Sequence, residues 1–266
     1  MSFSNLTNSE IMPVLFVGHG SPMNSIEDNE FTRTWNQIGK DLPKPQAILC
    51  ISAHWETRGT YVTSMAQPRT IHDFGGFPRE LFEVQYPVPG NPELATVIKQ
   101  EIKETEVGLD NSEWGIDHGA WSVIKHLYPL ANIPVVQISL DHFQPANYHY
   151  QLAKELAFLR SKGVLIIGSG NIVHNLREVN WQDPESAFDW AKDANDRVKT
   201  WITDGNHQAL IDYKKQGKAF DMAIPTPEHF IPLLYTLALQ NKKDKVSFFT
   251  DKLVMGSLSM TGVMIG

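Results

Sequence analysis

Histidine is the residue type in this sequence with the widest scope for chemistry. The chain has ten histidines and one cysteine among its 266 residues. Imidazole titrates near neutral pH and is the commonest metal ligand in proteins. The lone Cys50 excludes a thiolate zinc cluster and a disulfide framework. It lies in a predicted strand, which favours a small buried core residue over a nucleophile.

Three histidines follow short apolar runs of the sequence. His19 follows the run that ends at Val17, His54 the run that ends at Ser52, and His174 comes shortly after Gly168-Ser169-Gly170. Ligands of open α/β sheets bind beyond the carboxyl ends of the strands, so we expect these side chains to meet at one sheet edge. They predict a divalent-metal site, with scattered structural histidines as the alternative. Imidazole suits Zn, Fe, Cu and Ni, so the spacing does not select the metal.

A fourth histidine, His229, lies at the start of a predicted helix. The other histidines are weaker candidates. His72 and His118 lie in polar, glycine-containing turns, where each either lines a substrate pocket or belongs to ordinary loop structure. No role is assigned to the four that are typical of surface or helix positions: His126, His142, His149 and His207.

The elements that must position these residues alternate between short apolar strands and helices. Strands rich in Val and Ile and apolar on both faces indicate a buried, mainly parallel sheet. They are predicted over 13–17, 46–52, 133–140, 164–167, 246–249 and 256–264. Helices are predicted over 28–40, 91–105, 145–162, 186–204 and 227–240. This alternation predicts one α/β domain spanning 1–266, with helices on both faces of a central mainly parallel or mixed sheet.

The segment 71–89 is dense in glycine, proline and aromatic residues. It predicts a long structured loop, and Phe74, Phe77 and Phe82 are candidates for the walls of a pocket for a planar ring. Ordinary core packing beneath a loop is the alternative.

Net charge bears on two classes of partner. The value of -7, from 23 Lys+Arg and 30 Asp+Glu, argues against nucleic acid and against a polybasic membrane surface. No signal peptide or membrane-spanning run is predicted, which indicates a cytoplasmic protein. A monomer or a homodimer is expected.

Competing motifs are weak. Gly168-Ser169-Gly170 begins like a dinucleotide fingerprint, but Val173 stands where the third glycine should be. A nicotinamide oxidoreductase is therefore a minor alternative. The sequence has no G-x-S-x-G elbow, no phosphate-binding G-x-x-x-x-G-K-[ST] and no H-E-x-x-H.

Seven segments together resemble one family. They are GHGSPMN (18–24), ISAHWETRGT (51–60), TIHDFGGFP (70–78), WGIDHGAW (114–121), GSGNIVHNLR (168–177), PTPEHFIPLLY (225–235) and MGSLSM (255–260). The chain resembles the catalytic subunits of the class III extradiol ring-cleavage dioxygenases, which open aromatic rings. Within this family it is most similar to the DOPA 4,5-extradiol dioxygenase group, which includes a zinc-containing bacterial member.

The resemblance implies a single α/β domain with one metal ion. It implies that His19, His54 and His229 are metal ligands. It further implies that His174 is the general acid/base or a fourth ligand, and that His118 reaches the substrate pocket. The protocatechuate-type relatives use two His and a Glu, whereas here His229 takes the last place beside Glu228. The choice between Fe(II) and Zn(II) as the bound metal therefore stays open.

The implied reaction is extradiol cleavage of a DOPA-like catechol by O2, with His174 removing a proton and Fe(II) as the active metal. Zn(II) has no redox chemistry. A zinc-dependent hydrolase on the same site is one alternative, and a non-catalytic binder of metal or aromatic ligands is the other.

Overall fold

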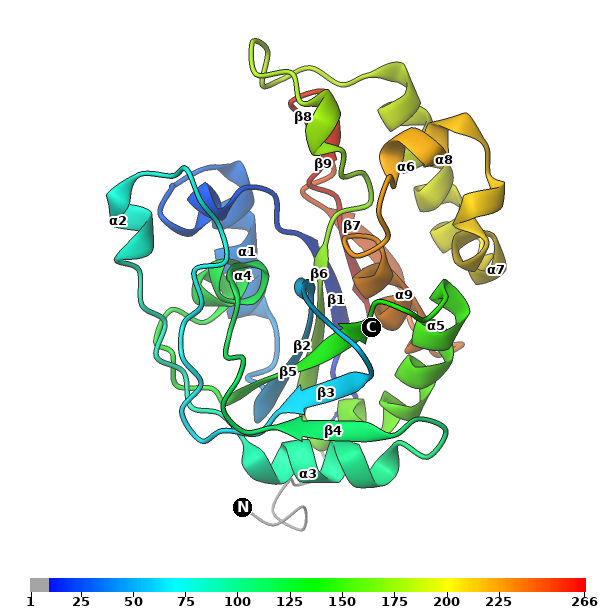
Figure 1. Cartoon of the computed structure of the whole chain (residues 1–266). Helices are drawn as coiled ribbons and strands as arrows, with labels where there is room; N and C mark the ends of the chain where they lie inside the picture. Colours follow the sequence, from blue (N-terminus) through cyan, green and yellow to red (C-terminus); the bar gives the residue numbers. More distant parts are fainter. Residues whose placement is uncertain (1–9) are drawn as a thin grey trace.

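The computed structural model of the chain, described over residues 10–266, is one α/β domain built on an eight-stranded sheet (Figure 1). The spatial order of the strands is β4-β3-β5-β2-β6-β1-β10-β7. Their bounds are β1 Val14–Gly18, β2 Ala47–Thr57, β3 Thr60–Thr63, β4 Val107–Asp110, β5 Val135–Asp141, β6 Val164–Gly170, β7 Val246–Phe249 and β10 Gly262–Ile265. A separate two-stranded sheet pairs β8 (Leu253–Val254) with β9 (Leu258–Ser259).

The centre of the large sheet is parallel. Strand β2 pairs in parallel with β5 and β6, and β6 pairs in parallel with β1. Strands β10 and β7 continue the sheet beyond β1 in antiparallel orientation, and β3 pairs antiparallel with β5. The predicted mainly parallel or mixed sheet is therefore confirmed, and the carboxyl ends of β1, β2 and β6 share one edge.

Helices cover both faces of this sheet, as predicted. In Figure 1, α1 and α4 lie on one side, and α5, α6 and α9 lie on the other. The α-helices are α1 Glu30–Asp41, α2 Arg79–Phe82, α3 Pro92–Glu101, α4 His118–Leu127, α5 Ala146–Glu155, α6 Asp189–Thr203, α7 His207–Ile211, α8 Lys218–Ala223 and α9 Ile231–Ala238. The 3-10 helices are η2 Pro22–Ser25, η3 Ala157–Lys162, η4 Leu176–Glu178 and η5 Tyr213–Lys215.

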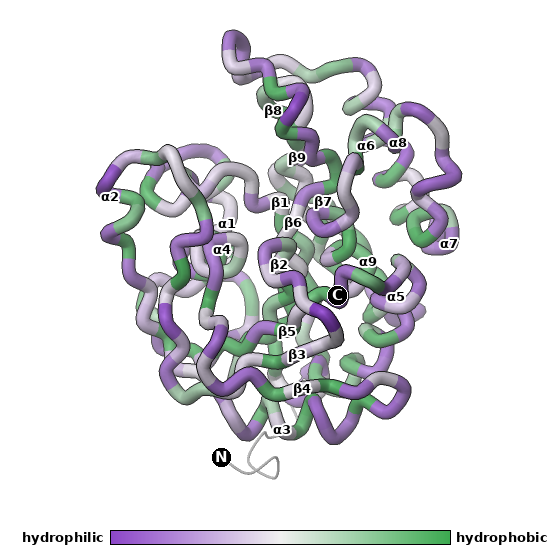
Figure 2. Tube along the Cα trace, in the orientation of Figure 1, coloured by the Kyte–Doolittle hydropathy of each residue, from purple (hydrophilic) through white to green (hydrophobic). Residues whose placement is uncertain are grey.

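Strand alternation produces two hydrophobic cores. Successive side chains of a strand point to opposite faces, so Val14 and Phe16 of β1 join one core while Leu15 and Val17 join the other. All four are buried, which explains why the run is apolar without alternation. In Figure 2, hydrophobic residues gather along the central strands, and hydrophilic residues are frequent in the segments around them.

Several predicted boundaries are wrong for local reasons. The helix predicted over 145–162 is α5 followed by η3, and Gly163 ends it in the left-handed conformation. The loop predicted over 71–89 contains the short α2. The turn predicted around His118 is the first turn of α4, because the Asp117 side chain accepts a hydrogen bond from the Ala120 backbone N–H and caps the helix.

None of the helices in residues 10–266 combines the length and the apolar character that crossing a bilayer requires.

Candidate metal centre and substrate pocket

Three histidines from distant parts of the chain converge at the carboxyl edge of the sheet. His19 directly follows β1, His54 lies near the end of β2, and His229 lies two residues before α9. Their ligand nitrogens all lie within 4.8 Å of one another. The Nε2 atoms of His19 and His54 are 3.2 Å apart. Two nitrogens bound about 2.1 Å from one ion lie about 3.0–3.4 Å apart, so this separation fits a shared ion.

The other ring nitrogen of His19 has a fixed role. Its Nδ1 lies 3.0 Å from the Ser169 hydroxyl, and that hydroxyl donates its own proton to the Gly119 carbonyl over 2.5 Å. Ser169 Oγ must therefore accept from His19 Nδ1–H. This chain of bonds sets the tautomer and leaves the Nε2 lone pair of His19 free.

Carboxylates contact the Nδ1 atoms of the other two histidines and fix their tautomers in the same way. His54 Nδ1 lies 3.2 Å from Asp73 Oδ2. His229 Nδ1 lies 3.0 Å from Glu228 Oε1, which also accepts from the Thr226 hydroxyl. Carboxylate partners of this kind orient ligand histidines and raise their basicity.

The resulting donor set fits a divalent cation. With protons on both Nδ1 atoms, the Nε2 lone pairs of His19 and His54 face each other without a proton between them. A cation relieves this repulsion.

Burial keeps the cluster neutral, which is the form that binds metals. Burial lowers the pKa of His19 and of His229 well below the ordinary value, and neighbouring histidines lower both further. Burial also lowers the pKa of His54 to about 3, with His118 adding to the shift and Asp73 opposing it. Protons therefore do not compete with a metal at neutral pH.

Two further groupings share residues with this cluster. His54, Asp73 and His118 lie within 4.8 Å of one another, and so do His174, Glu228 and His229. Ion pairs through Asp73 explain the first grouping, and the bond between His229 and Glu228 explains the second. The structure thus groups His229, and not Glu228, with His19 and His54.

His174 lies against the cluster. Its ring stacks on His229 with 3.5 Å between ring centroids and 8° between the planes. Within residues 10–266 its ring nitrogens make no hydrogen bond, so a lone pair is available to a ligand. Burial lowers the pKa of His174 to about 4, an effect opposed by Glu228, and the ring is neutral at pH 7.

His118 approaches the cluster from α4. Its ring centroid is 3.9 Å from that of His54 and 5.8 Å from that of His19. Its Nδ1 lies 3.0 Å from Asp73 Oδ1, at an angle too poor for a well-formed hydrogen bond. Asp73 also accepts from the His118 backbone N–H over 2.9 Å, so one carboxylate serves both His54 and His118.

Asp73, Ser169 and Asp117 support the site and were not singled out from the sequence. Asp73 and Ser169 fall inside motifs that were noticed, but nothing in their spacing shows which histidine each contacts. Asp117 is fully buried and accepts bonds from Ser52 (2.6 Å) and Gln137 (2.7 Å). Burial raises the pKa of Asp117, and the negative charge of Asp73 raises it further.

Glycine permits the close packing behind His229. The Asn171 N–H donates to the His229 carbonyl over 2.8 Å, and a Cβ on Gly170 would lie 2.1 Å from the same oxygen. A side chain at position 170 would therefore push the third histidine away from the other two.

A cavity of about 370 Å³ opens over the histidines, and we call it the ring pocket. Its volume is typical of a site for a small molecule. Two of the three predicted aromatic walls, Phe74 and Phe77, line it, whereas Phe82 does not. The lining residues are His19, Gly20, Ser21, Pro22, His54, Asp73, Phe74, Phe77, His118, His174, Leu176, Val179, Trp181, His229, Met255 and Leu258. The predicted candidate His72 is not among them; its Nε2 lies 2.9 Å from the Val84 carbonyl.

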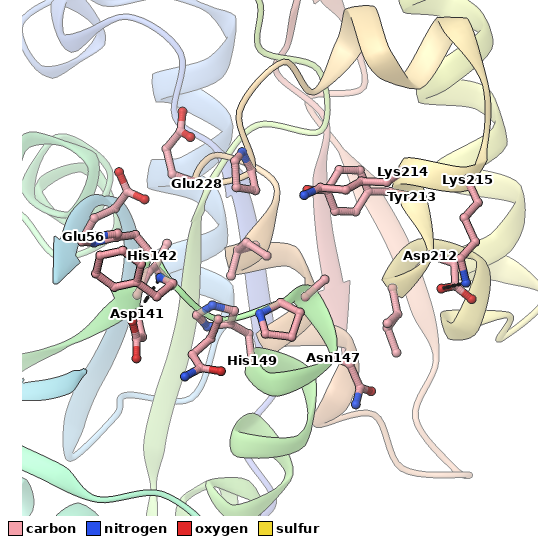
Figure 3. Close-up of a pocket in the computed structure, with 18 residues that line it drawn as sticks. Glu56, Asp141, His142, Asn147, His149, Asp212, Tyr213, Lys214, Lys215 and Glu228 are labelled. Carbon is pink, nitrogen blue, oxygen red and sulfur yellow. Dashed lines mark hydrogen bonds and ion pairs between the residues drawn. The ribbon is translucent and has the colours of Figure 1, made fainter. Parts of the chain in front are cut away.

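A second cavity of about 500 Å³ lies on the other side of Glu228, and we call it the side cavity. It is formed by the end of β5, the start of α5 and η5. Figure 3 shows Glu56 and Glu228 on one side, with Lys214 and the Lys215–Asp212 ion pair on the other. None of its lining residues lines the ring pocket.

The fold and this cluster define a class: an open α/β sheet with a histidine cluster that could hold a metal beyond its parallel strands. The family model described as the catalytic LigB subunit of aromatic ring-opening dioxygenase matches residues 13–266. The chain belongs to this family, which implies that it uses a metal and O2.

Individual relatives agree with the family. The chain is 46% identical to a 4,5-DOPA dioxygenase extradiol of Escherichia coli (strain K12), with 98% of this chain and 97% of the relative covered. It is 34% identical to a 4,5-DOPA dioxygenase extradiol of Beta vulgaris, with 95% and 96% covered. A crystal structure of an uncharacterized Escherichia coli K12 protein matches with a TM-score of 0.85 and 42% identity, covering 96% of this chain and 100% of that chain.

These matches identify an extradiol ring-opening dioxygenase. They support neither the zinc hydrolase, nor the non-catalytic binder, nor the nicotinamide oxidoreductase.

The Asp73→Asn variant is expected to lose about 10- to 100-fold in metal affinity, because removal of an outer partner of a ligand histidine has effects of this size. The amide keeps the shape, but its NH2 group cannot accept a hydrogen bond, so the contact with His54 or the contact with the His118 backbone N–H is lost. Metal affinity measured by competition with a chromogenic chelator tests this. Asp28→Asn is the matched control, since Asp28 is an exposed carboxylate outside the cluster that pairs with the exposed Arg33. Equal affinities for the two variants would contradict the role of Asp73.

The metal-free protein is expected to lose stability as the pH falls from 6.5 to about 4. Burial lowers the pKa of His149 and of His174 to about 4, whereas an unfolded histidine titrates near 6.5. Between pH 6.5 and about 4 the unfolded state therefore binds more protons than the folded state. The free energy of unfolding reaches its full value only above this pH window. Each such histidine contributes a slope of up to about 1.4 kcal/mol per pH unit.

Urea unfolding of the metal-free protein at pH 7.5, 6 and 5 measures that slope. His149→Gln should reduce the slope, because this histidine is buried outside the cluster. The matched variant His142→Gln should leave it unchanged, because His142 is exposed. A free energy of unfolding that does not change between pH 7.5 and 5 would contradict the argument.

Proposed function

We propose that the chain opens the ring of a DOPA-like catechol by extradiol cleavage at the ring pocket. The observation that carries the proposal is the convergence of three tautomer-fixed histidines beneath a pocket with aromatic walls. The similarity to proteins named 4,5-DOPA dioxygenase extradiol supports L-DOPA as the first substrate to test.

His19, His54 and His229 would hold the metal. The bound ion would supply Lewis acidity toward the two catechol oxygens, and Fe(II) would also supply the redox chemistry that Zn(II) lacks. Three protein ligands leave coordination positions open, which a site for a bidentate substrate needs.

His174 would remove a proton from the catechol. It is neutral at pH 7, lines the ring pocket and has an unengaged lone pair. Its stacking on His229 holds it beside the position where the catechol oxygens would bind. A fourth-ligand role for His174 would use the same lone pair, and the two roles are separated experimentally in the Discussion.

His118 and the phenylalanines would orient the substrate. The contact of Asp73 with Nδ1 of His118 leaves Nε2 as the nitrogen that faces the pocket. Phe74 packs edge-on against His118, with 5.4 Å between centroids, and places an aromatic ring beside it in the ring pocket. Cleavage adds both atoms of O2 and breaks a ring carbon–carbon bond next to the diol pair.

The experiment is oxygen uptake after metal exchange. The protein is stripped of metal, reloaded separately with Fe(II) and with Zn(II), and given L-DOPA or simpler catechols. Oxygen uptake with a coloured product is expected from the iron form only. An iron form with verified loading that binds catechols but consumes no oxygen would overturn the proposal.

A further inference from the structure

The ring pocket has an apolar mouth that is open to water. Trp181 is 77% exposed and Leu176 is 64% exposed, although both line the cavity. They belong to η4 and the segment after it, which projects beside β8 and β9 at the top of Figure 1. Large exposed apolar side chains at the rim of a pocket indicate a ligand-binding surface.

The wall of the ring pocket lacks a permanent cation. Among residues 10–266, none of the side chains that line it is lysine or arginine. The other titratable groups on its wall are the five histidines and Asp73, and Asp73 is engaged with His54 and His118. Arg177 follows Leu176 in the chain, but it is exposed and does not line the cavity.

Basic side chains are found instead in the side cavity. Lys214 and Lys215 line it, and Lys215 is paired with Asp212 (Figure 3). A carboxylate on the catechol ring therefore has no lysine or arginine from the described part of the chain to pair with in the pocket that binds the ring.

The apolar mouth and the lack of a cationic side chain affect negatively charged and positively charged substituents of a catechol in opposite ways. A carboxylate that enters an apolar wall without a partner loses hydration and gains nothing in return. An ammonium group at the mouth keeps part of its hydration and lies next to Trp181, whose indole ring can attract cations. Asp73 adds negative charge to the same wall.

We propose that the ring pocket selects catechols by the charge of their substituent. It takes neutral substituents and side chains that carry an ammonium group at the mouth, where Trp181 is a specificity-determining residue, and it rejects catechols with a carboxylate on the ring. This inference rests on the proposed function, since it assumes that the catechol oxygens face the histidines.

The first test compares 3,4-dihydroxybenzoate with 3,4-dihydroxybenzamide. The two have nearly the same shape, and both place the same two oxygens at the metal, so the contribution of these two oxygens to binding is nearly the same in both. We expect the acid to have a kcat/KM about 10- to 100-fold lower, the range for burying an unpaired polar or charged group. A Kd measured on the Zn(II)-loaded protein without oxygen should show the same ratio, independently of turnover.

The second test compares dopamine with 4-ethylcatechol. Dopamine should bind about three- to tenfold more tightly, the range for a partly exposed cation over an indole. Trp181→Leu should remove this advantage, and Trp181→Phe should keep part of it. Lys214→Ala in the side cavity is the control and should leave both ratios unchanged.

The outcomes separate this inference from the function itself. The proposed selection by charge is overturned if the acid binds as tightly as the amide. It is also overturned if dopamine keeps its advantage over 4-ethylcatechol in the Trp181→Leu variant. A Lys214→Ala effect on the acid:amide ratio also overturns it, because the carboxylate would then be sensed from the side cavity. If the iron form cleaves no catechol, the proposed function fails. The Kd ratios then still show whether the ring pocket selects ligands by charge.

Discussion

Replacing His54 with alanine is expected to remove metal binding and oxygen uptake together. His54 contributes one of the two Nε2 atoms that lie 3.2 Å apart, and it joins the cluster to Asp73. Loss of an outer partner alone costs about 10- to 100-fold in metal affinity, so loss of a ligand should cost at least about 100-fold. Metal content after dialysis and a chelator competition measure this directly.

Two controls make the result specific. His142→Ala removes an exposed histidine outside the cluster, and it should retain metal and activity. Circular dichroism of His54→Ala should match the parent, because the side chain lies at the sheet edge and the adjacent core is unchanged. A His54→Ala protein that retains stoichiometric metal would contradict the assignment of this cluster as the metal site.

The second large effect is expected from His174→Ala. If His174 is the base, kcat should fall by about 10²- to 10⁴-fold, the usual contribution of general acid–base catalysis. Metal affinity should stay near that of the parent, because the other three histidines retain their outer partners. Added imidazole should restore part of the lost rate, since removal of the side chain leaves room beside His229.

The pH dependence gives a second readout. Because the pKa of His174 is lowered to about 4, its unprotonated form predominates at pH 7 and is lost as the pH falls through about 4. A rate that depends on it should therefore fall at the acidic end. If His174→Ala instead loses metal as His54→Ala does, and imidazole restores metal content, then His174 is a ligand and not the base.

The sequence predicted the central strands because their signals are local and strong. The runs ending at Val17, Ser52, Leu140 and Ile167 are apolar on both faces, and all became strands of the sheet. Strand β3 (Thr60–Thr63) was missed because it is short and follows β2 after a tight turn at Gly59. Strand β4 (Val107–Asp110) contains Gly108 and ends in an aspartate, so its pattern was too weak to detect.

The site was predictable in part for a different reason. Parallel topology brings residues after different strands to one edge, which is how His19, His54 and His174 were placed together. The tautomer-setting contacts were not predictable, because Ser169 and Asp73 reach their histidines through packing and not through spacing. The position of His229 beside His19 likewise depends on the close approach of its carbonyl to Gly170.

The order of the strands also bears on how the chain is made in the cell. Strand β1 lies between β6 and β10, so this strand, the first among residues 10–266, acquires its second neighbour only when residues 262–265 have left the ribosome. His229 emerges shortly before them. A nascent chain can therefore offer a metal His19 and His54 long before the third histidine exists. With these three histidines as the proposed ligands, full-strength metal capture is a late event. Until residues 262–265 are available, the edge of β1 that pairs with β10 stays open to pairing with other chains.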